Sequence, residues 1–484
     1  MRSSDAPVLI VGAGPAGLTA AMTLSLHGIP SLLVDRRDGS SELPRATFLS
    51  TRSMELLRAW GLEHEVRAGG VDVAWHGWTC ESLAQARDGV PFPLGLPSPE
   101  QSAIASPTGP ACVPQDQLEP VLLRHLDGLG QCTVRWNAEL AELRDGHDGV
   151  EALLRDTRTG ESAAVRARYA VGADGAHSAV RRELGIPMHG ADRLADCATA
   201  LFHAPLWPIV GDLRYGIYDI TDPDGGGVLV PAGRDRWLYG LVRPPGALPA
   251  RERTAEALGR RIRAAIGAPG VEPLIERTGE FTFAAQVAER FRGRSTFLVG
   301  DAAHRVTPRG GTGLNTAIHD GYDLGWKLAW VLAGWARPEL LASYEGDRRP
   351  VVEHNVARSA EPPGTGRDAG VELHADLGGR IAHVWLRPGL STLDLLGPGL
   401  TLLTGPDADA WDAAAAAVPG PLPLTTRALD VMGARALGVG RRGAVVVRPD
   451  GVPLALCATD EDAAACARAG AKDLVGSQEL AAVA

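Results

Sequence analysis

Three glycines near the start of the 484-residue chain have the spacing of a phosphate-binding turn. Gly12, Gly14 and Gly17 form G-x-G-x-x-G directly after a short apolar run, and Ala16 lies within the same turn. The first glycine permits a tight turn, the second allows a pyrophosphate to approach the backbone, and the third allows a helix to pack closely against a strand. The free N–H groups at the start of that helix attract phosphate oxygens.

The residues that follow supply the structural context that this turn needs. Helical spacing of apolar residues continues to Gly28, a second apolar run covers residues 31–34, and Asp35 ends that run. A carboxylate at this strand end can accept hydrogen bonds from the hydroxyls of an adenosine ribose. Strand, turn, helix, strand and acid together predict a dinucleotide-binding unit at residues 8–35.

Two later strand ends also carry an acid beside a glycine. One is Asp174-Gly175, which precedes a short helical stretch, and the other is Gly300-Asp301. In a doubly wound sheet the ligand lies beyond the carboxyl ends of the strands. Both acids are therefore predicted to lie on the nucleotide side, although a salt-bridged structural aspartate is the alternative for Asp301.

A glycine-rich segment after Asp301 leads into a long apolar helix. Pro308, Gly311 and Gly313 belong to this segment, and Leu314 and Asn315 begin the helix. The unpaired N–H groups at such a helix start point toward an electron-rich group. The segment is therefore predicted to contact the ligand.

Two further polar residues lie at positions where loops and helices begin. Arg45 precedes an amphipathic helix, and Gln115 stands at the start of another. Both positions are compatible with contact to a nucleotide. A solvated loop arginine and a simple helix cap are the alternatives.

Residues 186–294 differ in character from the sequence around them. Strand-like segments surround one helical stretch, which predicts an inserted, largely antiparallel sheet. A small-molecule pocket commonly forms at such an interface. Arg214, Tyr215 and Tyr239 are candidates to line it, and a place on the sheet surface or in a core is the alternative for each.

The composition excludes several classes of function. A net charge of -10 argues against a nucleic-acid or anionic-membrane surface, and no segment has the pattern of a signal peptide or membrane span. The six cysteines have no C-x-x-C spacing, so no metal site is predicted. Reduced thiols in a cytoplasmic protein are expected.

Residues 6 to about 360 resemble the single-component FAD-dependent aromatic hydroxylases of the para-hydroxybenzoate hydroxylase class. Within that class the chain is most similar to enzymes that tailor aromatic polyketides in antibiotic biosynthesis. The resemblance rests on GAGPAG, PRATFLSTRSMELLRAWG, QDQLEPVL, GADGAHSAVR, GDAAHRVTPRGGTGLNTAIHDGYDLGWKLA and SYEGDRRP.

The resemblance implies an α/β protein with three domains. A doubly wound, Rossmann-like FAD-binding domain would cover 1–185 and 295–360, with 69–114 contributing to the substrate side. A mostly antiparallel substrate-binding sheet would cover 186–294. A thioredoxin-like α/β domain would cover 370–484, and its lack of a cysteine pair favours a structural or subunit-contact role in a monomer or homodimer.

The resemblance also implies how this chain would hold its cofactor. The glycine turn would bind the pyrophosphate of FAD and Asp35 the adenosine ribose. The remaining contacts to FAD would come from Arg36 at the adenosine, Arg45 and Gln115 at the phosphate and ribityl region, Asp174 and Gly175 beside both FAD and a transient nicotinamide, Asp301 at the ribityl or pyrophosphate side, and Gly313, Leu314 and Asn315 at the pyrimidine edge of the flavin.

The implied activity is that of an FAD-dependent monooxygenase. NADPH or NADH would reduce FAD, O2 would add at C4a, and the flavin C4a-hydroperoxide would hydroxylate an aromatic or quinoid polyketide-like substrate. A base that ionises a phenol is expected, and the sequence does not identify it. A single G-x-G-x-x-G fits a nicotinamide that binds only briefly.

Other activities remain open on the same scaffold. They are Baeyer–Villiger or ring-opening oxygenation, an antibiotic-inactivating hydroxylase, and a flavin-dependent substrate-binding protein with little turnover.

Overall fold

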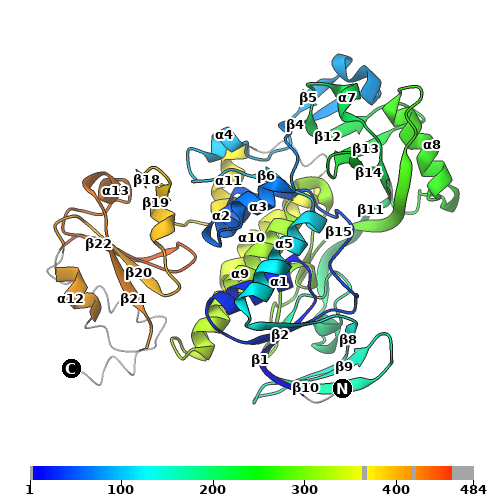
Figure 1. The fold of residues 1–484 in the computed structure, drawn as a ribbon. Helices are drawn as coiled ribbons and strands as arrows, with labels where there is room; N and C mark the ends of the chain where they lie inside the picture. The colour runs from blue at the N-terminus through cyan, green and yellow to red at the C-terminus, as the bar shows by residue number, and fades with distance from the viewer. Residues whose placement is uncertain (1–3, 362–367, 409, 417–420, 460–484) are drawn as a thin grey trace.

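The N-terminal turn belongs to a seven-stranded sheet in the computed structural model, which describes residues 4–361, 368–408, 410–416 and 421–459 (Figure 1). The strands are β1 (Ser4–Val11), β2 (Ser31–Val34), β7 (Cys132–Arg135), β8 (Ala138–Asp145), β9 (Val150–Asp156), β10 (Ser162–Gly172) and β16 (Thr296–Leu298). The order is β7-β2-β1-β10-β9-β8, with β16 beside β10. Strands β7, β2, β1, β10 and β16 are parallel, whereas β8, β9 and β10 form an antiparallel meander. The predicted doubly wound sheet is confirmed.

Helices α1 (Pro15–Leu26) and α9 (Gly313–Leu332) pack against each other beside this sheet, with α5 (Gln115–Leu129) next to α1 (Figure 1). Two glycines of α9 permit the close approach. A Cβ at Gly321 would lie 2.3 Å from the Ala16 carbonyl oxygen, and one at Gly325 would lie 2.7 Å from Cβ of Thr23. The start of α9 is thereby held near the glycine turn that opens α1.

An eight-stranded sheet forms the second layered unit (Figure 1). Its strands are β4 (Ala74–Cys80), β5 (Val90–Phe92), β11 (Met188–His203), β12 (Tyr215–Ile220), β13 (Gly227–Pro231), β14 (Arg236–Arg243), β15 (Leu274–Ala288) and β17 (His304–Arg305), in the order β17-β15-β11-β14-β13-β12-β4-β5. Only β4 and β12 pair in parallel. The predicted inserted sheet is confirmed, and it also takes in β4, β5 and β17 from outside residues 186–294. The limits of the three predicted domains stay a prediction.

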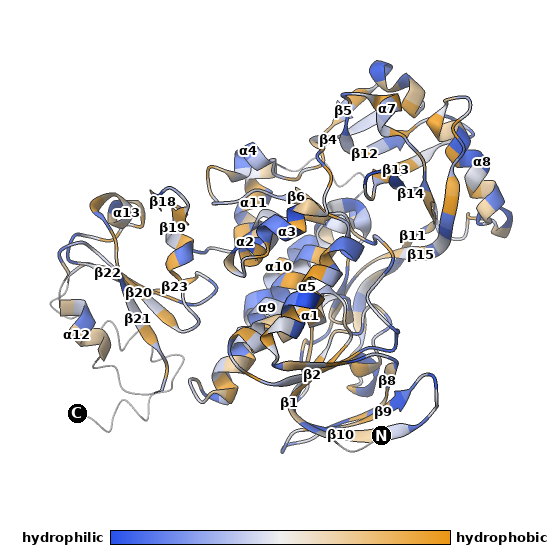
Figure 2. Cartoon of the chain, viewed as in Figure 1, coloured by the Kyte–Doolittle hydropathy of each residue, from blue (hydrophilic) through white to orange (hydrophobic). Residues whose placement is uncertain are grey.

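One face of this sheet is closed by helices α7 (Trp207–Val210) and α8 (Ala255–Ile266). Helix α8 alternates hydrophilic and hydrophobic residues along its surface, as Figure 2 shows. Its apolar side packs on the sheet through residues such as Leu258 and Ile262, which are fully buried. We call this covered side the outer face and the opposite side the inner face.

The C-terminal part is a separate α/β layer. Its sheet has the order β21-β20-β22-β23 and consists of β20 (Leu400–Thr404), β21 (Leu424–Ala428), β22 (Ala444–Val447) and β23 (Pro453–Cys457). Helices α12 (Ala410–Ala416) and α13 (Val431–Ala436) accompany it, whereas α11 (Ala369–Leu377) packs beside α2 (Thr51–Ala59) of the N-terminal part (Figure 1). The predicted C-terminal α/β domain is confirmed, and its residues beyond 459 lie outside the described part of the chain.

A buried ion pair joins the C-terminal part to the part that contains the seven-stranded sheet. Arg380 pairs with Glu55 of α2 (Thr51–Ala59), and both side chains are at most 4% exposed. The hydroxyl of Ser106 also donates to Glu55, at 2.7 Å. Because breaking a buried ion pair leaves an uncompensated charge, this junction favours one fixed arrangement of the two parts.

The thiols only partly match the expectation of reduced cysteines. Cys80, Cys112, Cys132 and Cys197 are free, as expected. Cys457 is disulfide-bonded, which corrects the expectation at that residue, and Cys466 lies outside the described residues. Among the described residues, no helix has the length and apolar character needed to cross a bilayer, and no cluster of His, Cys, Asp or Glu side chains is arranged to hold a metal ion.

Candidate active site

The three glycines of the N-terminal turn differ in what surrounds them. Gly12 has a φ of +110°, and a Cβ there would lie 2.2 Å from the carbonyl oxygen of Ala173. A Cβ at Gly17 would lie 1.9 Å from the carbonyl oxygen of Gly12. At Gly14 a Cβ would meet nothing within 4 Å. The first and third glycines therefore close the turn on itself, and the second faces open space where a phosphate has room.

The helix that begins at this turn has no capping side chain at its amino end. Gly14 is the N-cap residue of α1, no side chain caps the helix, and Ala16 lies in its first turn. The N–H groups of the first turn are then available to an anion, and the helix dipole favours negative charge there. The turn fits the pyrophosphate of a dinucleotide.

Asp35 lies at the end of β2 and is held by a neighbour that sequence reasoning missed. Its Oδ2 accepts a hydrogen bond from the Ala13 N–H at 2.8 Å, and Arg37 pairs with both carboxylate oxygens. Burial acts to raise the pKa of Asp35, but the hydrogen bonds from Arg37 and Ala13 bring it below its usual value. Arg36, the predicted adenosine neighbour, is exposed to solvent. Arg37 stands two positions after Asp35 in the sequence. This spacing could have identified it as a partner, because alternate residues of an extended chain lie on the same side.

Gln115 belongs to a buried polar cluster at the start of α5. Its Nε2 donates to Glu119 Oε1 at 2.7 Å, and Glu119 Oε2 accepts from the Ser41 N–H at 2.7 Å. Arg37 Nη1 lies 4.0 Å from Glu119 Oε2, which connects the cluster to Asp35. The Gln115 amide thus orients Glu119, which in turn holds Ser41, and the contact of the amide with a ribityl chain or phosphate stays a prediction.

Asp174 caps a helix. Its Oδ2 accepts from the N–H groups of Ala179 and Val180 at 2.6 and 3.1 Å, and Ser178 donates to Oδ1 at 2.5 Å. Gly175 has a φ of +81°, which a side chain would strain. This turn also packs on Gly12, so the first and second motifs meet in space. The contact of the Asp174 carboxylate with FAD or nicotinamide stays a prediction.

Arg45 and Asp301, which lie 256 positions apart in the sequence, interact through their charges in the folded chain. The Asp301 side chain reaches solvent, yet the protein around it acts to raise its pKa. His304 and Arg45 oppose that shift through their charges.

A buried network that sequence reasoning missed holds the Asp301 turn in place. Asp320 of α9 accepts from the Gly300 N–H at 3.0 Å, lies 2.6 Å from His304 Nε2, and accepts from Arg348 Nε at 2.7 Å. Burial acts to raise the pKa of Asp320, but His304 and Arg348 lower it to about 2. Arg181 adds a bond to the carbonyl of Ala302 at 2.9 Å, which links the second motif to the third.

The start of α9 is fixed by the side chain of Asn315. Its Oδ1 accepts from Ser50 N–H and Ser53 Oγ, both at 2.8 Å, and its Nδ2 donates to the carbonyls of Phe48 and Gly311 at 3.1 and 3.0 Å. Because the side chain is fully used, only its backbone is free for a ligand. The predicted backbone contacts at the flavin stay predictions.

The glycine-rich segment before α9 has the features of a ligand-binding turn. Gly311 has a φ of +63°, Pro308 is exposed, and Thr312 at the N-cap of α9 makes no capping hydrogen bond. The Thr312 hydroxyl is buried without a partner in the described part of the chain. Gly313 and Leu314 form the first turn of a 20-residue helix whose amino end therefore remains open to an anionic group.

The three residues predicted to contact substrate lie apart from this turn. Tyr239 is fully buried on the outer face, and its hydroxyl donates to the carbonyls of Gly225 and Gly226 at 3.0 and 2.9 Å. Tyr215 stacks on Trp78 with ring centroids 4.5 Å apart, and this pair belongs to the same outer side. This geometry favours packing roles for both tyrosines.

Arg214 is exposed, and its guanidinium lies over the ring of Trp207 at 4.3 Å from the centroid. It thus takes part in a cation–π contact with α7 on the outer side, rather than facing the inner face.

The inner face of the eight-stranded sheet lies against the segment before α9. Arg309 lies over the ring of Phe283 at 5.5 Å, and Phe48 packs edge-on against Trp75 at 5.2 Å. Apolar residues such as Leu238 are only partly buried on this face. An apolar, incompletely covered sheet beside a helix amino end is the arrangement expected of a pocket for an apolar ring system.

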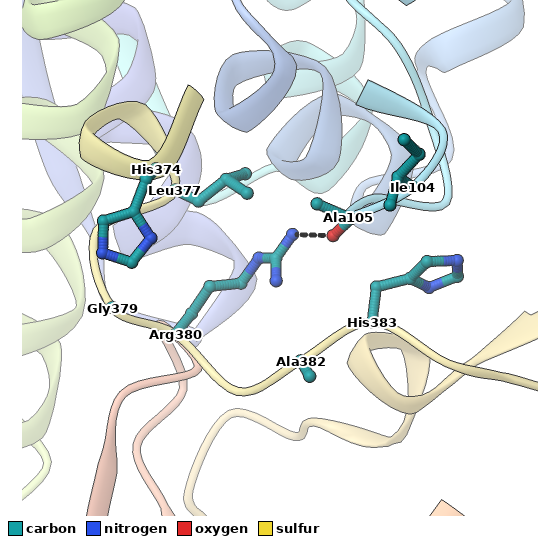
Figure 3. Close-up of a pocket in the computed structure, with 8 residues that line it drawn as sticks. All are labelled: Ile104, Ala105, His374, Leu377, Gly379, Arg380, Ala382 and His383. Atoms are coloured by element: carbon teal, nitrogen blue, oxygen red, sulfur yellow. Dashed lines mark hydrogen bonds between the residues drawn. The ribbon is translucent and has the colours of Figure 1, made fainter. Parts of the chain in front are cut away.

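Two cavities lie near the C-terminal part. Figure 3 shows one of about 260 Å³, where Arg380 Nη2 donates to the Ala105 carbonyl at 2.8 Å, and no residue predicted to bind FAD lines it. The other, of about 290 Å³, is lined by Phe48, Thr312 and Asn315 on one side and by α10 (Ser343–Ala360) and α11 on the other. Only the second reaches the segment before α9.

Comparison with known proteins gives consistent results. The family described as FAD binding domain matches residues 5–359. The tetracenomycin A2 monooxygenase-dioxygenase of Streptomyces glaucescens is 33% identical over 93% of each chain. The aklavinone 12-hydroxylase of Streptomyces peucetius subsp. caesius is 35% identical over 86% of this chain and 94% of its own.

A solved structure extends this result to three dimensions. The ternary complex of aklavinone-11 hydroxylase with FAD and aklavinone superposes with a TM-score of 0.86 at 32% identity, and it covers 96% of this chain and 98% of its own. The open Gly14 position and the uncapped starts of α1 and α9 fit FAD in this chain too. The chain belongs to the FAD-dependent monooxygenases of the aromatic polyketide hydroxylase type, in the para-hydroxybenzoate hydroxylase class.

Proposed function

We propose that this monooxygenase uses NADPH or NADH and O2 to hydroxylate an aromatic or quinoid, polyketide-like compound at a ring carbon. The observation that carries the proposal is the inner face of the eight-stranded sheet, which is apolar and only partly covered, and which lies beside the open amino end of α9. Relatives named for aklavinone and tetracenomycin support a polycyclic substrate of this kind.

The chain's own residues would hold FAD at the glycine turn and at the polar residues around it. The turn at Gly12, Gly14 and Gly17 would hold the pyrophosphate. Asp35, held by Arg37, would bind the adenosine ribose, and Gln115 would contact the phosphate and ribityl region. Bound FAD would supply the chemistry that activates O2 and transfers one oxygen atom.

The remaining residues would orient the flavin and exclude water. The N–H groups of Gly313, Leu314 and Asn315 would stabilise negative charge at the pyrimidine edge, because a helix amino end favours anions and does so more strongly where water is excluded. Arg45 and Asp301, which interact through their charges, would contact the region between the ring and the phosphates. The sheet would place the substrate ring above this segment.

Anaerobic stopped-flow reduction of the purified protein by NADPH tests the proposal. A panel of polycyclic phenols is added in parallel, and the reduced protein is then mixed with oxygenated buffer. We expect one class of phenol to accelerate flavin reduction and to yield a product one oxygen atom heavier. Bound flavin that neither nicotinamide reduces, with or without phenols, would contradict the proposal.

Ring-opening or Baeyer–Villiger oxygenation is the second candidate function. The relative from Streptomyces glaucescens is named a monooxygenase-dioxygenase, which indicates that this scaffold supports more than one outcome. Mass spectrometry of the product separates the two, because an inserted oxygen creates an ester that base hydrolyses, whereas a ring hydroxyl survives. A flavin-dependent binding protein would give no oxygenated product at all.

A further inference from the structure

Strand β12 presents one carboxylate on the inner face of the eight-stranded sheet. Its outer-face residues Tyr218 and Ile220 are buried under α7 and α8 at 0% and 3% exposure. Because successive residues of a strand point to opposite faces, Asp219 points to the inner face. Thr79 of β4 and Val228 of β13 are its cross-strand partners, so they share that face.

The Asp219 carboxylate has no hydrogen bond and no ion pair among the residues that the structure describes. It is nevertheless half-buried, and burial raises its pKa. By contrast, the buried carboxylates of Asp35 and Asp196 each pair with an arginine, Arg37 and Arg193 respectively. A half-buried carboxylate without a protein partner on the inner face is free to accept a hydrogen bond from a ligand that binds there.

The surroundings of Asp219 specify what that partner would be. The inner face carries apolar side chains, including Ile217 and Val228 beside Asp219, and no basic residue is paired with it in the described chain. The site suits a flat apolar ring that carries a hydrogen-bond donor.

We propose that Asp219 accepts a hydrogen bond from a phenolic hydroxyl of the substrate and removes its proton during hydroxylation. The O–H bond breaks, the proton passes to a carboxylate oxygen of Asp219, and the electron pair stays on the phenol oxygen. The ring carbons ortho and para to that oxygen become more electron-rich and attack the electrophilic oxygen more readily. The inference rests on the proposed function, which requires such a base.

Ligand binding to the oxidised holoenzyme tests this role without turnover. The probes are alizarin, a dihydroxyanthraquinone whose visible colour changes on ionisation, and its dimethyl ether, which has no hydroxyl to donate. We expect the wild-type protein to bind alizarin about tenfold more tightly than the ether, as for one hydrogen bond to a charged group, and to shift the ionisation of bound alizarin to higher pH, because the Asp219 carboxylate stabilises the hydroxyl that donates to it and repels the phenolate.

Three variants separate a role in proton transfer from a role in folding. Asp219→Asn should lose both the preference for alizarin and the ionisation shift, with unchanged flavin content and melting temperature. Asp219→Glu should recover part of the ionisation shift. Asp212→Asn removes an exposed carboxylate just before β12 and should behave like the wild type.

The two proposals fail in different ways. An Asp219→Asn variant that keeps the preference for alizarin and its ionisation shift overturns the role of Asp219, whatever the turnover. A wild-type protein that passes the binding test but oxygenates no phenol overturns the proposed function and leaves Asp219 as a recognition residue. With a phenol that does turn over, Asp219→Asn should also lower kcat more than it changes KM.

Discussion

The two faces of the eight-stranded sheet are built from the same strands and differ in how completely their side chains are covered. On the outer face Trp237, Tyr218 and Tyr239 are fully buried, and both tyrosine hydroxyls donate to backbone carbonyls. On the inner face Leu238 is only partly covered, and the Asp219 carboxylate is unpartnered within the described chain. The outer face supplies stability, and the inner face leaves contacts for a ligand to complete.

The N-terminal turn shows the same division within a few residues. Gly12 and Gly17 face the protein's own backbone, whereas Gly14 faces open space. Substitutions at these positions should therefore separate stability from cofactor affinity, which is the distinction that the two sheet faces also predict.

The largest effect is expected from Gly17→Val. Its Cβ would lie 1.9 Å from the Gly12 carbonyl oxygen, so the turn must open. We expect more than about hundredfold weaker FAD binding together with a lower melting temperature of the apoprotein. Flavin absorbance after gel filtration and thermal unfolding of the apoprotein measure the two effects.

Gly14→Val is the matched control for that variant. Its side chain would enter open space, so apoprotein stability should change by less than about 1 kcal/mol while FAD affinity still falls. Equal destabilisation of the two apoproteins would contradict the distinction between the glycines.

Neighbouring residues of β14 compare the two sheet faces directly. Trp237→Ala removes a fully buried outer-face ring and should cost about 3–5 kcal/mol of unfolding free energy. Leu238→Ala removes a partly covered inner-face side chain and should cost less than half of that, while raising KM for the substrate. Urea unfolding and steady-state kinetics provide the measurements, and a larger stability loss for Leu238→Ala would reverse the assignment of the faces.

Asp376 tests whether the cavity beside the start of α9 also contains an unfavourable polar group. Burial raises its pKa to about 6, although the Arg52 N–H donates to it at 2.9 Å. A carboxyl whose folded pKa is raised destabilises the protein progressively as pH rises from the unfolded pKa to the folded pKa. Asp376→Asn should therefore stabilise the protein by about 1–3 kcal/mol at pH 8, by about half of that at pH 5 and by little at pH 4. A gain of equal size at all three pH values would rule out this cause.

The parts of the site that were predicted well from the sequence are those that depend on local patterns. Gly12, Gly14 and Gly17 and the strands around them follow from short-range spacing, because each glycine answers a steric need of one turn. The family resemblance, the fold class and FAD were likewise correct, since the motifs that carry them are contiguous stretches of chain.

Side-chain partners that lie far apart in the sequence could not be predicted. The Arg380–Glu55 pair spans 325 positions, and Asp320 meets Gly300 only because the glycines of α9 let it approach α1. No local pattern encodes such pairings before the fold is known.

The assignment of strand faces failed for a related reason. Alternation along β14 puts Tyr239 and Leu238 on opposite faces, but only the packing of α8 decides which face is covered. Tyr239 was predicted from the sequence because it is aromatic, and Asp219 was not predicted. The lack of a basic partner for Asp219 among the described residues can be recognised only in the folded structure.

Product analysis under oxygen-18 tests the central claim most directly. The holoenzyme, NADPH and the phenol that best stimulates flavin reduction are incubated under labelled O2 in unlabelled water, and the product is analysed by mass spectrometry. A flavin-dependent hydroxylase should place one oxygen-18 atom on a ring carbon of the product. A product without label, or NADPH oxidation that yields only hydrogen peroxide with every phenol in the panel, would contradict the account.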